Sequence, residues 1–191
     1  MASHSDEKVV RRELGDPDTA VILLHGRGAT ASSIVQLGEA VADDALLLAP
    51  QAANREWYPE SFLEPRERNQ PWLDAALDRV AAMLRQAGEE GLERERCTLV
   101  GFSQGACLAS EYAARRGDEI ELDGYDGDLD GMPFFIGCSD DDPYVPEERV
   151  HASASVFEKL GASVTTYIEP GMGHTINQHE QQQLRQHLQA L

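Results

Sequence analysis

The chain has 191 residues, enough for one domain with a buried core but short for two. Its 34 acidic and 16 basic residues leave a formal net charge of −18, which disfavours binding to nucleic acid or anionic lipid because both would be repelled. No apolar stretch approaches the roughly 20 residues that span a bilayer, so we expect no stable membrane insertion and a cytoplasmic protein.

Strand-like and helix-like patterns alternate along the whole sequence. Apolar and β-branched runs predict strands near residues 19–24, 45–49, 97–102, 133–137 and 163–168, with a weaker one near 8–12. The segments between them predict helices near residues 31–42, 70–87, 104–116, 147–160 and 177–190. In the second helix, Pro71 suits the first helical position and Asn69 is a candidate cap. We therefore expect a single α/β domain over residues 1–191, with helices on both faces of a mostly parallel sheet.

The first strong strand runs into the sequence H-G-R-G at residues 25–28. Glycines leave backbone N–H groups uncovered, so the amide of Arg27 is a candidate donor to a negatively charged oxygen that develops in a reaction. We expect the His25 imidazole to brace this loop instead of acting as a base. The alternative is an ordinary glycine turn after a strand.

Aromatic residues gather between the strand predicted near residues 45–49 and the first turn of the helix predicted near residues 70–87. Trp57, Phe62 and Trp72 are candidates for the lining of a substrate pocket. The alternative is that these side chains fill an edge of the core.

The sequence G-F-S-Q-G at residues 101–105 is the most informative motif of the chain. It matches G-x-S-x-G and lies between a predicted strand and a predicted helix, which is the setting of a nucleophile elbow. On so tight a turn, side chains at the two glycines would collide with the strand and the helix. Ser103 is therefore the candidate nucleophile, and the backbone N–H of Gln104 is the second candidate oxyanion donor. The alternative is a chance match in a glycine-bearing loop.

A serine hydroxyl needs a base, and the base needs an acid that orients it. Asp142 follows one predicted strand and His174 follows the next, both on loops. Taken alone, an aspartate before a proline commonly starts a turn, and a histidine in a glycine-rich loop is often a surface residue. In this order behind an elbow, they predict a catalytic triad of Ser103, Asp142 and His174.

These motifs together resemble the phospholipase/carboxylesterase family of α/β-hydrolases, to which acyl-protein thioesterases and small carboxylesterases belong. The resemblance is carried by residues 24–28, 101–106, 142–146 and 171–174 and covers nearly the whole chain. It implies a serine hydrolase that cleaves carboxylic esters, thioesters or lysophospholipids without a metal or cofactor. It also implies Ser103, Asp142 and His174 as the triad, and the Arg27 and Gln104 amides as the oxyanion hole. Among three adjacent aspartates, it selects the one that precedes Pro143.

The segment 117–131 departs from the family pattern, because it is rich in carboxylates and has no apolar stretch able to form a core strand. Either the sheet has lost one strand, or the strand that carries the acid has moved in beside the strand that carries the nucleophile. Residues 126–131 match the first half of a calcium loop, D-x-D-x-D-G. The twelfth position of that loop is Gly137 instead of glutamate, so we favour a solvated acidic loop and expect no metal site.

Other readings of function stay open at this point. A missing strand that disconnects the triad would leave a folded binding or scaffold module. A lactone or peptide hydrolase would share the same triad. We expect an open site for small, short-acyl esters, because no long insertion forms a lid. An exposed edge strand makes a homodimer an alternative to a monomer.

Composition also predicts the setting in which the protein works. Lys8 and Lys159 are the only lysines, so arginine supplies nearly all of the cationic charge. Together with the acidic excess, this predicts a halophilic protein whose self-repulsion is screened by salt. The alternative is an ordinary acidic protein of a mesophile. Cys97, Cys107 and Cys138 lack the spacing of metal ligands and predict free thiols in a reducing compartment.

Overall fold

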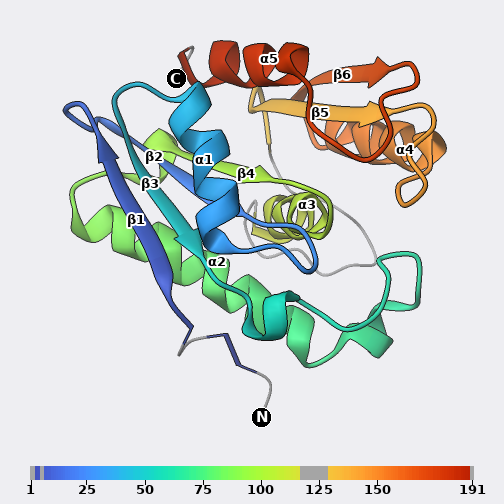
Figure 1. The fold of residues 1–191 in the computed structure, drawn as a ribbon, viewed down its shortest axis with the longest axis horizontal. Coiled ribbons are helices and arrows are strands. Elements are labelled where there is room, and N and C mark those ends of the chain that lie inside the picture. Colours follow the sequence, from blue (N-terminus) through green and yellow to red (C-terminus); the bar gives the residue numbers. More distant parts are fainter. Residues whose placement is uncertain (1–2, 5–6, 117–128, 190–191) are drawn as a thin grey trace. The chain divides into compact units, whose positions relative to one another are not determined.

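The computed structural model describes residues 3–4, 7–116 and 129–189 (Figure 1). The described chain divides into two compact units, one that ends at Tyr112 and one that begins at Ala113. We describe each unit by itself, and the single domain expected over residues 1–191 stays a prediction.

The first unit is built on a four-stranded sheet in the order β1-β3-β2-β4. Its strands are β1 (Val9–Leu14), β2 (Thr19–Leu24), β3 (Ala45–Pro50) and β4 (Cys97–Gly101). Strand β2 runs parallel to both β3 and β4, whereas β1 pairs antiparallel with β3 at the edge. The two central strands, β2 and β3, are almost fully buried. Their continuous apolar sequences are typical of strands that are covered on both faces.

Helices cover both faces of this sheet (Figure 1). Successive side chains of a strand point to opposite faces, so strands that are apolar throughout need a covering layer on each face. Helix α1 (Ala31–Val41) approaches one face so closely that a Cβ at Gly38 would lie 2.8 Å from Leu23 Cδ1. On the other face, Ile22 and Leu48 belong to a buried cluster with side chains of α2 (Trp72–Glu89) and the first part of α3 (Gln104–Arg116). This arrangement brings the end of β4 and the start of α3 to one edge of a rigid core.

The start of α2 differs from the expectation. A short 3₁₀ helix, Arg66–Asn69, precedes it, and α2 begins at Trp72 after Pro71, with no side chain capping its first turn. Asn69 is buried and holds the preceding loop instead: its Oδ1 accepts from the Glu60 amide at 2.8 Å, and its Nδ2 donates to the Ser61 carbonyl. The prediction that Asn69 caps α2 is therefore wrong, because both polar ends of its amide are used by another segment.

The second unit contains two parallel strands, β5 (Pro133–Ser139) and β6 (Ser163–Glu169). Helices α4 (Glu147–Lys159) and α5 (Gln178–Gln189) cover opposite faces of this pair (Figure 1). The ring of Phe134 stacks on Phe157 of α4 at 3.8 Å, and the neighbouring Phe135 faces His187 of α5. Small and apolar side chains complete the core on the α4 side.

The described strands form two sheets of four and two strands. The alternating order and the parallel pairing agree with the predicted α/β class. Within the second unit, β5 pairs with β6. The two arrangements expected around the acidic segment, a lost strand or an acid strand beside the nucleophile strand, both stay predictions. Residues 117–128, which make up most of the acidic segment, lie outside the described part of the chain. Among the described residues, no helix combines the length and the apolar character that membrane spanning requires.

Candidate active site

Ser103 lies on the sharp turn between β4 and α3, with a backbone φ of +53°. A non-glycine residue in this left-handed region is strained, and such strain is concentrated at functional sites. A Cβ at Gly101 would overlap the Gly105 carbonyl, and a Cβ at Gly105 would overlap the Leu24 carbonyl at the end of β2. The two glycines of the motif therefore allow the tight passage that presents the Ser103 hydroxyl.

The predicted oxyanion loop lies next to this turn within the first unit. A Cβ at Gly26 would be 3.2 Å from the Ser103 Cβ and 3.3 Å from the Phe102 carbonyl oxygen. Gln104 is the first residue of α3, where helix N–H groups have no intrahelical partner. The loop that contains Arg27 and the backbone N–H of Gln104 therefore both lie next to the turn that carries Ser103.

His25 is fully buried and braces this loop. Its Nε2 accepts the Ala52 amide at 3.0 Å, which leaves Nδ1 to donate to the Gly26 carbonyl at 2.8 Å. Burial lowers the pKa of His25, so the neutral imidazole is favoured. Its carbonyl accepts the indole N–H of Trp57 at 2.9 Å. The predicted bracing role of His25 is confirmed, and both ring nitrogens are occupied by the backbone.

The side chains of Gln104 and Arg27 hold the loop 56–60, a role that sequence reasoning missed. Gln104 accepts from the Trp57 amide at 2.9 Å through Oε1 and donates to the Tyr58 carbonyl at 2.8 Å through Nε2. The Arg27 guanidinium donates to the carbonyls of Tyr58, Pro59 and Glu60 and to the Glu56 carboxylate. Both residues were singled out for their backbone amides alone. Nothing in the local sequence indicates these side-chain partners, because they come from a distant segment.

The three aromatic residues predicted to line a substrate pocket have different surroundings. Trp57 is 0% exposed and belongs to the core cluster, which fits the alternative that it fills the core. Trp72 is partly buried against the same cluster. Phe62 is 37% exposed and is available for contact from solvent. The pocket prediction therefore rests on Phe62 and Trp72.

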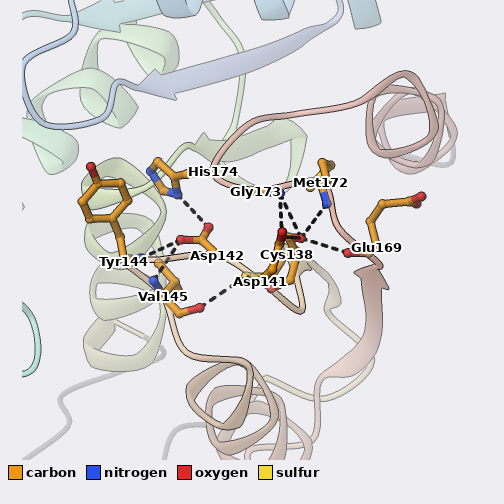
Figure 2. A network of polar contacts seen from close by, with 10 residues as sticks. Cys138, Asp141, Asp142, Tyr144, Val145, Glu169, Met172, Gly173 and His174 are labelled. Carbon is orange, nitrogen blue, oxygen red and sulfur yellow. Dashed lines mark hydrogen bonds and ion pairs between the residues drawn. The ribbon is translucent and has the colours of Figure 1, made fainter.

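Asp142 and His174 meet in the second unit (Figure 2). His174 Nδ1 lies 2.7 Å from Asp142 Oδ2, and the amides of Tyr144 and Val145 donate to Asp142 Oδ1 at 2.8 and 3.1 Å. Burial raises the pKa of the Asp142 carboxyl, but the hydrogen bonds from His174 and the two amides outweigh it, so the pKa is lowered overall. The carboxylate is therefore ionised and lies against the Nδ1 side of the imidazole ring.

The loop that carries His174 is held by the three residues that precede Asp142 in the sequence. Ser139, Asp140 and Asp141 accept hydrogen bonds from the backbone amides of residues 171–173. Figure 2 shows the contacts of Met172 and Gly173. The exposed ring of Tyr144 packs edge-on against His174 with centroids 4.9 Å apart. Sequence reasoning missed these roles, although three consecutive aspartates were a visible signal.

The structure therefore contains both halves of the predicted triad, each within its own unit. Ser103 and the predicted oxyanion loop belong to the first unit, and the Asp142–His174 pair belongs to the second. Among the described residues, no group of three histidine, cysteine or acidic side chains is placed to hold a metal ion. Residues 126–128, the first half of the calcium-like sequence at residues 126–131, lie outside the described chain. The described residues thus include a serine with a strained backbone, a loop braced by the neutral imidazole of His25, and a His174 ring hydrogen-bonded to Asp142.

Comparison with known proteins adds independent information. The family model described as Phospholipase/Carboxylesterase matches residues 5–116. The match ends immediately before the acidic segment at which the sequence departs from the family pattern. The Bacillus subtilis (strain 168) protein MhqD, named as a hydrolase, is 28% identical over 189 residues, covering 91% of this chain and 94% of MhqD.

Solved structures extend the likeness over both units. A phospholipase/carboxylesterase from Dyadobacter fermentans is 35% identical, with a TM-score of 0.90 over 99% of each chain. The carboxylesterase of Bacillus cereus has a TM-score of 0.80 at 20% identity, covering 97% of this chain and 95% of its own, and shows likeness of fold alone.

Proposed function

Because the chain belongs to the phospholipase/carboxylesterase family and is an esterase with an α/β-hydrolase fold, we propose that it cleaves carboxylic esters through a triad of Ser103, His174 and Asp142. Membership rests on the family match over more than half of the chain and on the 35% identical relative. The family supplies the reaction class, and the residues of this chain supply the proposed roles.

In the proposed mechanism, His174 removes the Ser103 proton at Nε2 as the serine oxygen attacks the ester carbonyl. Asp142 holds Nδ1 and stabilises the imidazolium that forms. The amides of Arg27 and Gln104 donate to the oxyanion; removing one such donor costs roughly 10²–10³ in turnover. His174 then protonates the leaving alcohol, and water attacks the acyl-enzyme with His174 again as the base.

The observation that carries this proposal is the hydrogen bond of 2.7 Å between His174 Nδ1 and Asp142 Oδ2. It joins two residues that lie 32 positions apart on separate loops. Such a contact provides an oriented base, and the positive φ of Ser103 supplies a nucleophile that needs one.

We propose short-acyl esters as the substrate class, with thioesters and lysophospholipids as further candidates. Phe62 is exposed and Trp72 partly exposed, and both would offer apolar surface to an acyl group. No cofactor enters the proposed chemistry, because the nucleophile, base and oxyanion donors all come from the chain. We expect a monomer or a homodimer.

Fluorophosphonate labelling in molar potassium chloride, read by intact mass, tests the triad. We expect stoichiometric labelling of the wild type and none of Ser103→Ala. Asp142→Asn should label far more slowly, because loss of the orienting carboxylate lowers turnover by about 10⁴-fold in a comparable triad. Ser110→Ala, a matched serine on α3, should label like the wild type.

Absence of labelling in a folded, monodisperse wild type would overturn the proposal and favour a binding or scaffold module. If labelling occurs, a panel of esters, thioesters, lactones and peptides distinguishes the hydrolase classes. Fastest turnover of a lactone or a peptide would replace the proposed substrate class and leave the triad in place.

A further inference from the structure

The three backbone N–H groups that immediately precede His174 in the sequence all donate to side chains of residues 139–141. The Gly171 amide donates to Asp140 Oδ1 at 2.8 Å. The Met172 amide donates to Ser139 Oγ at 3.0 Å. The Gly173 amide donates to Asp141 Oδ1 at 2.7 Å and to Ser139 Oγ at 3.1 Å. The side chains of residues 139–141 therefore accept a hydrogen bond from every amide of residues 171–173. Figure 2 shows the contacts of Met172 and Gly173.

The backbone of this loop explains why its amides converge. Gly171 and Gly173 have φ values of +65° and +71°, in the left-handed region that favours glycine. Alternation of left-handed and ordinary residues turns successive N–H groups toward the same side and creates a concavity that attracts anions. Here the anionic groups come from the chain itself.

Ser139 is the buried anchor of this contact. It is the last residue of β5 and is 1% exposed. Its hydroxyl lies 2.6 Å from Asp141 Oδ1 and 3.0 Å from the Glu169 carbonyl, so its single proton has an acceptor while its lone pairs receive two amides. The Ser139 hydroxyl and the Gly173 amide lower the pKa of Asp141, which keeps this carboxyl an acceptor.

The two partners of the catalytic pair are held in different ways. Asp142 is fixed by the amides of its own turn, Tyr144 and Val145. His174 follows a loop with two left-handed glycines, which lose more conformational freedom on ordering than any other residue. The position of the imidazole therefore depends on what fixes residues 171–173.

We propose that Asp141 and Ser139 are positioning residues for the catalytic histidine: they clamp residues 171–173 so that His174 Nδ1 meets Asp142. The proposal rests on the proposed function, in which His174 is the base. Asp141 itself is exposed, so solvent screens its charge and its action is through hydrogen-bond geometry. Asp140 and Asp141 thus accept hydrogen bonds from the backbone of residues 171–173, whereas Asp142 contacts the His174 ring.

Steady-state kinetics of Asp141→Ala, Asp141→Asn and Ser139→Ala test this inference on a short-acyl ester. We expect Asp141→Ala to lower kcat by about 10- to 100-fold with little change in KM, since small misplacements of a catalytic group have effects of this size. Asp141→Asn keeps an acceptor oxygen and should be milder. If charge alone mattered, the two variants would be equally impaired.

A matched control changes the same group at another loop. Asp44 Oδ1 accepts the Asp16 amide at 3.3 Å in the first unit, so Asp44→Asn should leave kcat unchanged. The downfield proton resonance of the His174 Nδ1–H group gives a readout that a purely structural role would not move. It should broaden or disappear in folded Asp141→Ala and persist in Asp44→Asn.

The inference is overturned if kcat of Asp141→Ala stays within about twofold of the control. Should the variants fail to fold, hydrogen exchange of the wild type decides the question: a Gly173 amide that exchanges as fast as an unstructured one would overturn the clamp, and slow exchange would support it. Failure of the proposed function is distinguishable, because Ser103→Ala would then retain activity or the wild type would have none.

Discussion

Gly105 lies where the start of α3 passes closest to the end of β2. A Cβ at this position would overlap the Leu24 carbonyl group, and a Cβ at Gly101 would overlap Gly105 itself. The strain of Ser103, at φ +53°, is therefore maintained by a close backbone contact. At the scale of single residues, the elbow therefore depends on having glycine, without a Cβ, at positions 101 and 105.

We predict that Gly105→Ala destabilises the protein by about 1–3 kcal/mol or more, because the added methyl forces backbone groups apart. Urea unfolding followed by tryptophan fluorescence measures this. Gly88→Ala is the matched control: Gly88 is within α2 and has no neighbouring atom within 4 Å of a Cβ, so the change should stabilise by about 0.5–1 kcal/mol. Equal unfolding midpoints for the two variants would contradict the steric argument.

At the scale of elements, the connection between β3 and α2 is fastened by two buried histidines. The amides of Ala52 and Ala53 are adjacent in the chain, and each donates to a different imidazole, His25 Nε2 and His4 Nδ1, at 3.0 Å. The other nitrogen of His4 lies 3.0 Å from the Trp57 carbonyl. An amide can donate only to an unprotonated ring nitrogen, so both histidines are neutral in this arrangement.

Burial lowers the pKa of both His4 and His25 below 6.5, so the unfolded chain binds more protons than the folded one as the pH falls. We predict that their contribution to stability is complete above about pH 6.5 and is lost below it. Urea unfolding at pH values from 8 to 5 measures the slope. Burial of Glu180 raises its pKa and gives a slope of opposite sign, so the wild type must be compared with variants.

The slope should become flatter in His4→Gln and in His25→Gln, each of which removes one titrating imidazole. His151→Gln is the matched control, because His151 is exposed on α4 and contacts only the Glu147 carboxylate among its described partners. An identical slope in all four proteins would show that the buried histidines do not titrate with unfolding.

At the scale of the whole molecule, charge is the dominant feature. The net charge of −18 leaves many carboxylates without a cation, although surface pairs such as Arg12–Glu39 and Arg96–Asp18 form where arginine is available. Such exposed pairs contribute little individually. Repulsion among the remaining carboxylates therefore opposes the compact state until salt screens it.

We predict that the thermal midpoint rises with potassium chloride up to about 1 M, where the Debye length is about 3 Å. Each kcal/mol that screening contributes should raise the midpoint by roughly 2–4 °C. Circular dichroism melts at low and molar salt measure this. A double variant, Glu93→Gln with Glu95→Gln, removes two exposed charges and should depend less on salt. Equal midpoints of the wild type at both salt concentrations would count against a halophilic protein.

Local patterns were sufficient to predict most of the elements and to single out the candidate site residues. The strand after residue 18, the elbow at Ser103 and the alternating order of strands and helices could all be predicted, because periodicity and glycine placement act over a few residues. The start of α2 could not, since Asn69 had an equally good partner in a distant loop. The burial of Trp57 also escaped prediction, because an indole fits a pocket lining and a core equally well.

The sequence by itself determined the α/β class, the reaction family and the order of Ser103, Asp142 and His174, because each depends on short motifs and their succession. Only the tertiary structure decided what each neighbouring group does. It placed Gln104 and Arg27 on the loop 56–60 and assigned Asp140 and Asp141 to the histidine loop. The physical reason is that a side chain's partner across 30 or more residues depends on where both backbones come to lie, which no local pattern encodes.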